Sequence, residues 1–266
     1  MRYVYIICIC ILLIILYVIY EYFQLECRKF VHYDLDRGLG IKAVVITDLH
    51  NKLLSAKDLE KIRREQPDCI LFAGDLLVWD EPDISKALTS VKALAEIADV
   101  YFSYGNHELR FKDEHKEEWE ELLKKLPSNF YALDNDHRSL NDKVEVYGIS
   151  LKRENYKKGR VFDMGDENAD VFKNMPEGRF NILLAHNPDL TEYYDRVMHA
   201  DLTVSGHLHG GVVRLPLFGG LVFSTYGIKH RDRGLYEGRH VVSSGAGEHL
   251  FPSRIFNRCE IVIIQL

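Results

Sequence analysis

The pattern of apolar and polar positions separates one long apolar run at the N-terminus from a series of shorter segments. Short apolar runs predict β-strands at residues 41–47, 69–73, 100–104, 144–149, 180–185, 202–205 and 260–266. Apolar residues at helical spacing predict helices at 56–66, 82–98, 113–126 and 188–198, the first with Ser55 as its N-cap. Past residue 211 the chain shows short strands and Gly-rich turns. This order predicts a layered α/β sandwich in which two sheets are in contact.

The N-terminal run from Val4 to Tyr20 contains no charged residue. As a helix with a rise of ~1.5 Å per residue it would be about 26 Å long, close to the thickness of the hydrocarbon core of a bilayer. A cleaved signal peptide is the competing interpretation, but the following YEYFQLEC offers no small-x-small cleavage site. We therefore expect an uncleaved transmembrane anchor at residues 1–24, a linker at 25–40 and a folded domain at 41–266.

Charge and cysteine content indicate the location of the domain and the kinds of site and partner to expect. Basic residues after the apolar run, Arg28, Lys29 and Arg37, favour a single-pass membrane protein whose domain faces the cytoplasm. The five cysteines form no C-x-x-C pair, so neither a disulfide framework nor a thiolate metal site is expected, and free thiols fit a reducing compartment. The formal net charge of −6 leaves no broad basic surface and argues against nucleic acid as a partner.

Residues able to bind metal follow nearly every predicted strand. Ligands of open α/β sheets collect beyond the carboxyl ends of the strands, so these turns would deliver their side chains to one place. A single Asp or Gly-Asn after a strand is usually a turn residue, but here five of the 12 histidines lie in such turns. The turns are Asp48-Leu49-His50, Gly74-Asp75, Gly105-Asn106-His107-Glu108, His186-Asn187 and Gly206-His207-Leu208-His209.

The residue types in these turns indicate the metal and the substrate. Asp48 and His50 are two positions apart, as are His207 and His209, so each pair projects to one side of an extended segment. Oxygen and nitrogen ligands without a thiolate suit Mn, Fe, Zn, Ni or Mg. Two divalent ions would make the site strongly positive, which calls for an anionic substrate.

The order of these motifs resembles that of the calcineurin-like metallophosphoesterases over residues 41–266. The segments HGGVVRLPLFGGLVF and FNRCEIVIIQL resemble a membrane-associated bacterial branch related to UDP-2,3-diacylglucosamine pyrophosphatases. The resemblance implies a four-layer α/β/β/α sandwich that holds two divalent metal ions. It also implies that Asp75 bridges the ions and that His107 is a catalytic residue just off the metals, as general acid or phosphate-contacting group, oriented by Glu108. The remaining ligands it implies are Asp48, His50 and His209 for one ion, and Asn106, His186 and His207 for the other.

The expected function is hydrolysis of a phosphate ester or pyrophosphate by a metal-bridging hydroxide. The substrate would be a small or amphiphilic phosphate compound, with a nucleotide-linked lipid at the membrane as one candidate. A phosphoprotein phosphatase or nuclease of the same fold is an alternative. A non-catalytic membrane-bound interaction module is another, although such a module would be expected to lose ligands, and all seven ligand positions are intact here.

Overall fold

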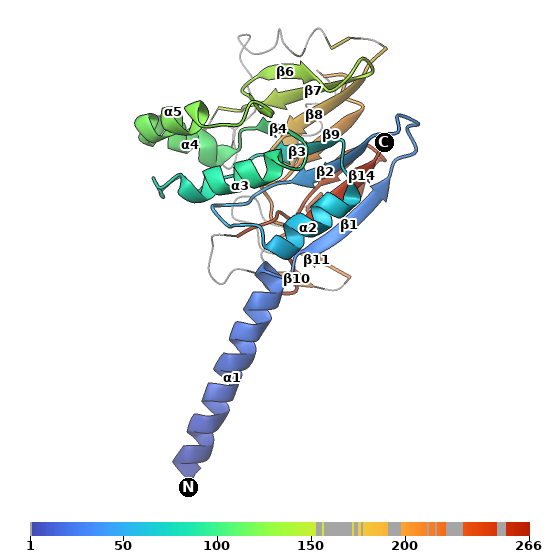
Figure 1. Cartoon of the computed structure of the whole chain (residues 1–266). Helices are drawn as coiled ribbons and strands as arrows, with labels where there is room; N and C mark the ends of the chain where they lie inside the picture. Colours follow the sequence, from blue (N-terminus) through green and yellow to red (C-terminus); the bar gives the residue numbers. More distant parts are fainter. Residues whose placement is uncertain are drawn as a thin grey trace.

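Two six-stranded sheets form the body of the protein, and helix α1 (Arg2–Leu25) projects from one end of it (Figure 1). This arrangement is seen in a computed structural model. The model describes residues 2–152, 156, 172, 175–176, 178–190, 198–211, 213–215, 217–221, 231–248 and 254–266.

The first sheet has the strand order β1-β14-β2-β3-β4-β5 and is parallel except at the β14–β2 pair. Its strands are β1 (Lys29–Asp34), β14 (Glu260–Gln265), β2 (Lys42–Ile46), β3 (Cys69–Ala73), β4 (Asp99–Ser103) and β5 (Phe130–Leu133). The central strand β3 is apolar throughout and buried on both faces, as expected for a strand covered on each side. In β2, Val44 and Ile46 pack toward the helices, whereas Ala43 and Val45 pack toward the second sheet.

The second sheet has the order β12-β13-β9-β8-β7-β6 and is parallel from β13 to β7. Its strands are β12 (Gly234–Tyr236), β13 (His240–Val242), β9 (Leu202–Ser205), β8 (Phe180–Ala185), β7 (Val144–Ile149) and β6 (Asp136–Ser139). Phe172, Met175 and Met198 pack on its outer face. A short hairpin, β10 (Arg214–Leu215) and β11 (Gly219–Gly220), lies apart from both sheets. The predicted two-sheet α/β architecture is therefore confirmed.

Helices cover the outer face of the first sheet (Figure 1). They are α2 (Ala56–Glu65), α3 (Ser85–Ala95), α4 (Asn106–Glu114) and α5 (Lys116–Lys124). The N-cap of α2 at Ser55 is confirmed, with a capping box to Asp58. Of the helix predicted at 113–126, α5 forms Lys116–Lys124, and the sequence did not predict α4, which begins directly after Gly105 and ends at Glu114. Of the helix predicted at 188–198, Pro188–Leu190 forms a 3-10 turn, and 191–197 lie outside the described residues.

The segment expected to be a linker takes part in the fold. Lys29–Asp34 forms edge strand β1, which pairs with β14. Arg28 is 3% exposed, and its guanidinium donates to Asp58 Oδ2 at 2.9 Å and to the carbonyl of Ala246 at 2.6 Å. The stretch is short and rich in charge, so its weak alternation did not identify a strand. α1 is thus joined to the domain at a fixed position.

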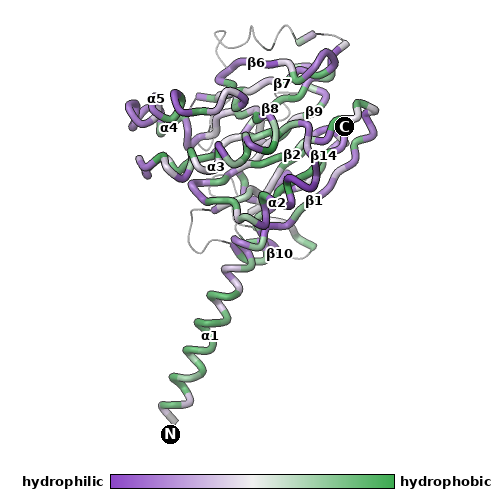
Figure 2. The backbone as a smooth tube through the Cα atoms, viewed as in Figure 1, coloured by the Kyte–Doolittle hydropathy of each residue, from purple (hydrophilic) through white to green (hydrophobic). Residues whose placement is uncertain are grey.

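Helix α1 is hydrophobic along most of its length (Figure 2), and its large apolar side chains are exposed. The span Tyr3–Leu25 has 23 residues and a mean hydropathy of 2.8, and none of its apolar window is buried against the described residues. At ~1.5 Å per residue it is about 34 Å long, enough to cross a hydrocarbon core of about 30 Å. A core helix would be covered by the domain, and this one is not. By length and composition α1 is therefore able to cross a membrane.

Candidate metal centre

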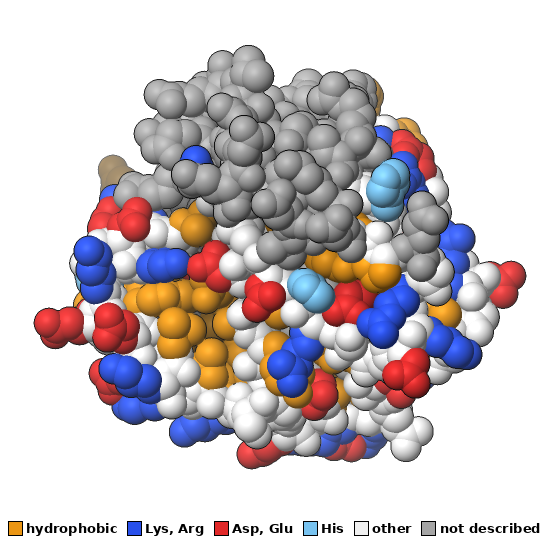
Figure 3. All heavy atoms as spheres, turned by 90° about the horizontal axis from the view of Figure 1, so that it is seen from above, with side chains coloured by type: hydrophobic (Ala, Val, Ile, Leu, Met, Phe, Trp, Pro, Cys, Tyr) orange, Lys and Arg blue, Asp and Glu red, His pale blue; other side chains and the backbone are white. Residues whose placement is uncertain are grey.

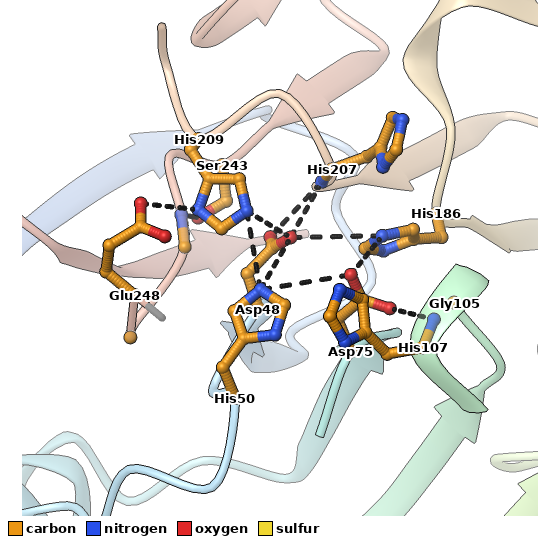
Figure 4. A network of polar contacts seen from close by, with 12 residues as sticks. Asp48, His50, Asp75, Gly105, His107, His186, His207, His209, Ser243 and Glu248 are labelled. Carbon is orange, nitrogen blue, oxygen red and sulfur yellow. Dashed lines mark hydrogen bonds and ion pairs between the residues drawn. The ribbon is translucent and has the colours of Figure 1, made fainter. Parts of the chain in front are cut away.

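The two sheets bring their strand ends to a common site (Figure 4). The parallel strands β2, β3 and β4 end at the same edge of the first sheet, and β8 and β9 do so in the second. The residues that follow them directly include Asp48, Asp75, Asn106, His186 and His207. Packing of the sheets against each other places the two edges side by side, so segments far apart in sequence meet.

One group of side chains comprises Asp48, His50 and His209, which are all buried and have ligand atoms within 4.8 Å of one another. His209 Nε2 lies 3.6 Å from Asp48 Oδ1 and 3.3 Å from His50 Nε2. Two imidazole nitrogens at that separation, next to a carboxylate oxygen, form a donor set that suits a divalent cation.

A second group comprises Asp75, His186 and His207 and meets the same distance criterion. His186 Nε2 lies 3.0 Å from Asp75 Oδ2, and His50 Nε2 of the first group lies 3.9 Å from that same oxygen. Asp75 Oδ2 therefore stands between the two groups. This is the geometry expected of a bridging carboxylate.

Several buried polar atoms in this region have no hydrogen-bond partner among the described residues, and two of them belong to proposed ligands of the second ion. These two are His207 Nε2 and Asn106 Oδ1, and both are buried. Leaving such atoms unpaired is costly, so each one needs an explanation. A cation that accepted both atoms as ligands would supply the missing partners. The residues present therefore fit the metal ions that the sequence implied.

Tight backbone turns hold these side chains. Asp48, His50, Asp75, His207 and His209 all have φ between 49° and 68°, in the left-handed region. Non-glycine residues rarely occupy that region, and such strain is concentrated at functional sites. Close approach also explains two glycines. A Cβ on Gly206 would overlap Asp48 Oδ2, and one on Gly105 would overlap Asp75 Oδ1.

Hydrogen bonds to the backbone set the orientation of these ligands. The carbonyl of Ala73 lies 2.8 Å from His186 Nδ1 and can accept its proton, which directs Nε2 toward the carboxylates. The amide of His207 donates to Asp48 Oδ1 at 3.0 Å, and the amide of His107 donates to Asp75 Oδ1 at 2.9 Å. Partners of this kind orient metal ligands and tune their basicity.

Sequence reasoning missed three residues that hold His209. Glu248 Oε2 lies 3.2 Å from His209 Nδ1, and the buried guanidinium of Arg254 lies 3.4 Å from the same carboxylate oxygen. Asn257 Nδ2 donates to the carbonyl of His209 at 2.6 Å. A carboxylate behind an imidazole is a common support for a metal ligand. Nothing in the sequence marked these residues, since they follow no strand-end motif containing histidine.

Glu108 does not act as expected. Its described hydrogen bonds come from backbone amides, those of Asp75 and Gly105 at 2.8 Å and that of Leu77 at 3.2 Å. The carboxylate therefore holds the turn after β3 against the start of α4, rather than orienting His107 directly. Burial and the nearby Asp75 raise the pKa of Glu108 to about 7.

His107 is held by the turn that Glu108 supports. Its Nδ1 accepts a hydrogen bond from the backbone amide of Trp79 at 3.2 Å. The neutral ring is then the tautomer with its proton on Nε2. The ring of His107 lies 4.6 Å from that of His50, between centroids. His107 also belongs to a donor group with His50 and Asp75, so the distances alone permit it to bind a cation.

In the metal-free protein, the two histidines of the second donor group differ in protonation. Burial alone would lower the pKa of His186, but Asp75 and Asp48 beside it raise that pKa to about 10. Burial and the neighbouring His186 lower the pKa of His207 to about 3. Near neutral pH, His186 thus carries a proton whereas His207 is neutral and ready to bind a cation.

Cation binding to the second group is expected to release about one proton, from His186, because a ligating imidazole must be neutral. At pH values below 10, the apparent affinity for the cation should therefore increase by up to ~10-fold for each unit by which the pH is raised. Titration calorimetry of metal-free protein at pH 8, in two buffers of different ionisation enthalpy, measures the released proton. The proton should disappear in His186→Gln. Wild-type binding without proton release would contradict the raised pKa.

The pKa of His186 also affects the folding stability of the metal-free protein. It is raised in the folded state, so its contribution to stability is fully present below the unfolded value of about 6.5. The contribution is lost as pH rises through about 10.

The sequence model of the calcineurin-like phosphoesterase family matches residues 41–211, more than half of the chain, and this range contains every residue of the two donor groups. The chain belongs to this family. Members normally use divalent metal ions, in agreement with the two donor groups.

Curated relatives span most of this metallophosphoesterase. It is 29% identical over 245 residues to the phosphodiesterase YaeI of Escherichia coli, covering 87% of this chain and 84% of the relative. It is 27% identical over 252 residues to the metallophosphoesterase YkuE of Bacillus subtilis, covering 85% and 79%. Among solved structures, the NAD nucleotidase NadN of Haemophilus influenzae matches with a TM-score of 0.51 and 17% identity, covering 78% of this chain and 46% of that one. The structural likeness concerns the fold alone.

Proposed function

We propose that this metallophosphoesterase is a phosphohydrolase that uses two divalent metal ions. The observation that carries the proposal is the position of Asp75 Oδ2, 3.0 Å from His186 Nε2 in one donor group and 3.9 Å from His50 Nε2 in the other. One carboxylate within reach of two adjacent donor sets supports a pair of ions rather than two separate sites. Asp48, His50 and His209 would hold one ion, and Asn106, His186 and His207 the other.

The paired ions, when bound, would activate water and neutralise phosphoryl oxygens during in-line displacement. The chain's own residues keep the site in a state that favours binding. The Ala73 carbonyl accepts from His186 Nδ1, so Nε2 faces inward and offers a lone pair once its proton is released, and Glu248 supports His209 in the same way. Backbone amides occupy one oxygen of Asp75 and contact Asp48, so these carboxylates cannot rotate freely.

His107 is the group that we assign to the leaving oxygen. With Nδ1 accepting from the Trp79 amide, the Nε2–H is the remaining donor of the neutral ring. A hydrogen bond or proton from Nε2 to the leaving oxygen stabilises the charge that develops as the ester bond breaks. The backbone contact means that His107 works without rotating, because its orientation is set before substrate binds.

We further propose that the substrate is an amphiphilic phosphate compound presented at the membrane. Two observations support this, the apolar span of α1 and the rigid join between α1 and the domain through buried Arg28. A nucleotide-linked lipid is the substrate class of the branch that the sequence resembles. Such a compound carries phosphate and is held in the membrane by its acyl chains. Lys29 and Arg37 beyond the span favour a domain on the cytoplasmic side.

A truncation series tests the anchor and the substrate class together. Deletion of residues 1–25 keeps Arg28 and β1, so we expect a soluble and folded domain with unchanged kcat/KM on a water-soluble nitrophenyl phosphodiester. On a phosphodiester embedded in vesicles, kcat/KM should fall, since tethering raises the local concentration of enzyme at the surface. Deletion of residues 1–34 is the control. It removes strand β1 and also leaves Asp58 buried without Arg28, which alone costs about 3–5 kcal/mol, so it should lower the melting temperature strongly.

The outcomes separate the proposals. No hydrolysis of any mono-, di- or pyrophosphate with Mn, Zn or Mg added would reject the phosphohydrolase. Equal kcat/KM values of full-length and 26–266 protein on the embedded substrate would reject the amphiphilic substrate while leaving the hydrolase intact. Extraction of full-length protein from vesicles by carbonate would reject the anchor.

A further inference from the structure

A group of exposed apolar side chains lies at the end of the domain from which α1 emerges. Leu217 and Phe218, at the turn of the β10–β11 hairpin, are 102% and 75% exposed. Phe256, on a different segment, is 63% exposed, and Leu215 is 38% exposed. We call these four residues the apolar tip. Large apolar side chains gathered in water usually mark a site of contact.

Contacts within the domain place the apolar tip beside α1. The ring of Phe256 lies 6.1 Å from that of Tyr20, between centroids, and the Phe256 amide donates to the Tyr20 hydroxyl at 2.5 Å. The hairpin is tied to the same segment, since the Arg214 amide donates to the carbonyl of Ile255 at 2.9 Å. Figure 1 shows β10 and β11 at the junction of α1 with the domain.

The level of Tyr20 along α1 fixes the depth of this contact. Tyr20 belongs to the span Tyr3–Leu25, so a bilayer crossed by that span reaches to about the level of Phe256. Phe256 and the hairpin residues Leu215 and Leu217 line one cavity of about 460 Å³, together with Arg214, Gly219 and Arg233. The hairpin therefore stands next to the same bilayer surface. In water these side chains would be exposed, whereas in the interface they would be buried among acyl chains.

The charged surroundings also match a bilayer surface. Tyr22 and Phe23 of the last turn of α1 line a groove whose charged side chains are mostly basic, namely Arg28, Lys57, Lys61 and Arg258, with Glu26 and Asp58 as its carboxylates. Amphipathic rings with cations are the usual composition of a membrane interface, where basic groups attract anionic lipids. On the described part of the opposite face, basic and acidic side chains surround an apolar patch (Figure 3).

We propose that the apolar tip inserts into the bilayer interface beside α1 and forms a second, lipid-facing contact of the domain. The proposal rests on α1 spanning the membrane. A single helix leaves the domain free to tilt relative to the membrane surface, whereas a second contact restricts that tilt. Asn257, the residue that follows Phe256, links this contact to the candidate metal centre. Asn257 donates to the carbonyls of His209 and Gly211, so the segment that meets lipid also holds a loop of the candidate metal centre.

Tryptophan quenching in vesicles tests the contact. Full-length Phe218→Trp protein is reconstituted in phosphatidylcholine and phosphatidylglycerol vesicles whose acyl chains are brominated close to the headgroup. Trp79 and Trp119 emit in every variant, so the wild-type spectrum is subtracted. We expect a loss of roughly twofold or more of the added emission, because an interfacial side chain lies ~5–10 Å deep. Leu123→Trp on α5 is the matched control at an exposed leucine, and its added emission should not change.

The possible results distinguish a second lipid contact from an anchor alone. Quenching at position 218 but not at 123 supports the second contact. Protein that resists carbonate extraction but shows no quenching at either position overturns the contact and leaves the anchor in place. Protein that fails to stay with the vesicles overturns both. Equal quenching at both positions also rejects the contact, because it would reflect general adsorption of the domain.

Discussion

Replacing Asp75 with Asn is expected to reduce kcat/KM by ~10³-fold or more and to leave at most one weakly bound metal ion per chain. The buried carboxylate stands between His50 and His186, and its negative charge is the one that both proposed ions share. An amide of the same shape keeps the hydrogen bond from the His107 amide but removes the charge. Elemental analysis of the purified variant and steady-state kinetics with added Mn or Zn measure both effects.

The control for Asp75 is Asp134→Asn. Asp134 pairs with Lys112 on the surface at 2.9 Å, and exposed ion pairs contribute little, so this variant should keep both ions and full activity. The far-ultraviolet circular dichroism of Asp75→Asn should match that of wild type, since its hydrogen-bonding shape is retained. An Asp75→Asn protein that binds two ions and turns over normally would rule out the shared-carboxylate centre.

Replacing His107 is expected to lower kcat by about 10²–10⁴-fold, with both metal ions retained. Two substitutions, His107→Asn and His107→Gln, distinguish the contributions of its two ring nitrogens. Asn can still accept from the Trp79 amide where Nδ1 does, but it has no group at the Nε2 position. Gln reaches the Nε2 position with an amide donor, so it should recover part of the activity. The loss should be largest for alkyl leaving groups, which need protonation most.

Three outcomes would contradict this assignment of His107. Equal losses on a nitrophenyl ester and an alkyl ester would exclude a role at the leaving oxygen. Loss of one metal ion in His107→Asn would instead make His107 a ligand, in agreement with its place in the group with His50 and Asp75. Full activity of the Asn variant would remove His107 from the chemistry altogether.

Much of the fold could be predicted from local pattern. The strands at residues 69–73, 144–149, 180–185 and 202–205 are confirmed with the same bounds. The capping box at Ser55 and the apolar run of α1 were also identifiable, because capping and apolarity are properties of adjacent residues. The proposed ligands were identifiable for a related reason. Each one stands at the end of a strand, so its neighbourhood is set by topology rather than by details of packing.

The tertiary structure decided what depends on distant partners. Lys29–Asp34 became a strand only because β14, at the other end of the chain, offers an edge to pair with. Arg254 and Asn257 support His209 from 45 and 48 residues away, and no local signal connects them. Glu108 was expected to orient His107, but in the structure its carboxylate accepts from backbone amides that converge on it from two loops. A sequence reports periodicity and local propensity, whereas the partner of a buried polar group is set by which surfaces pack together.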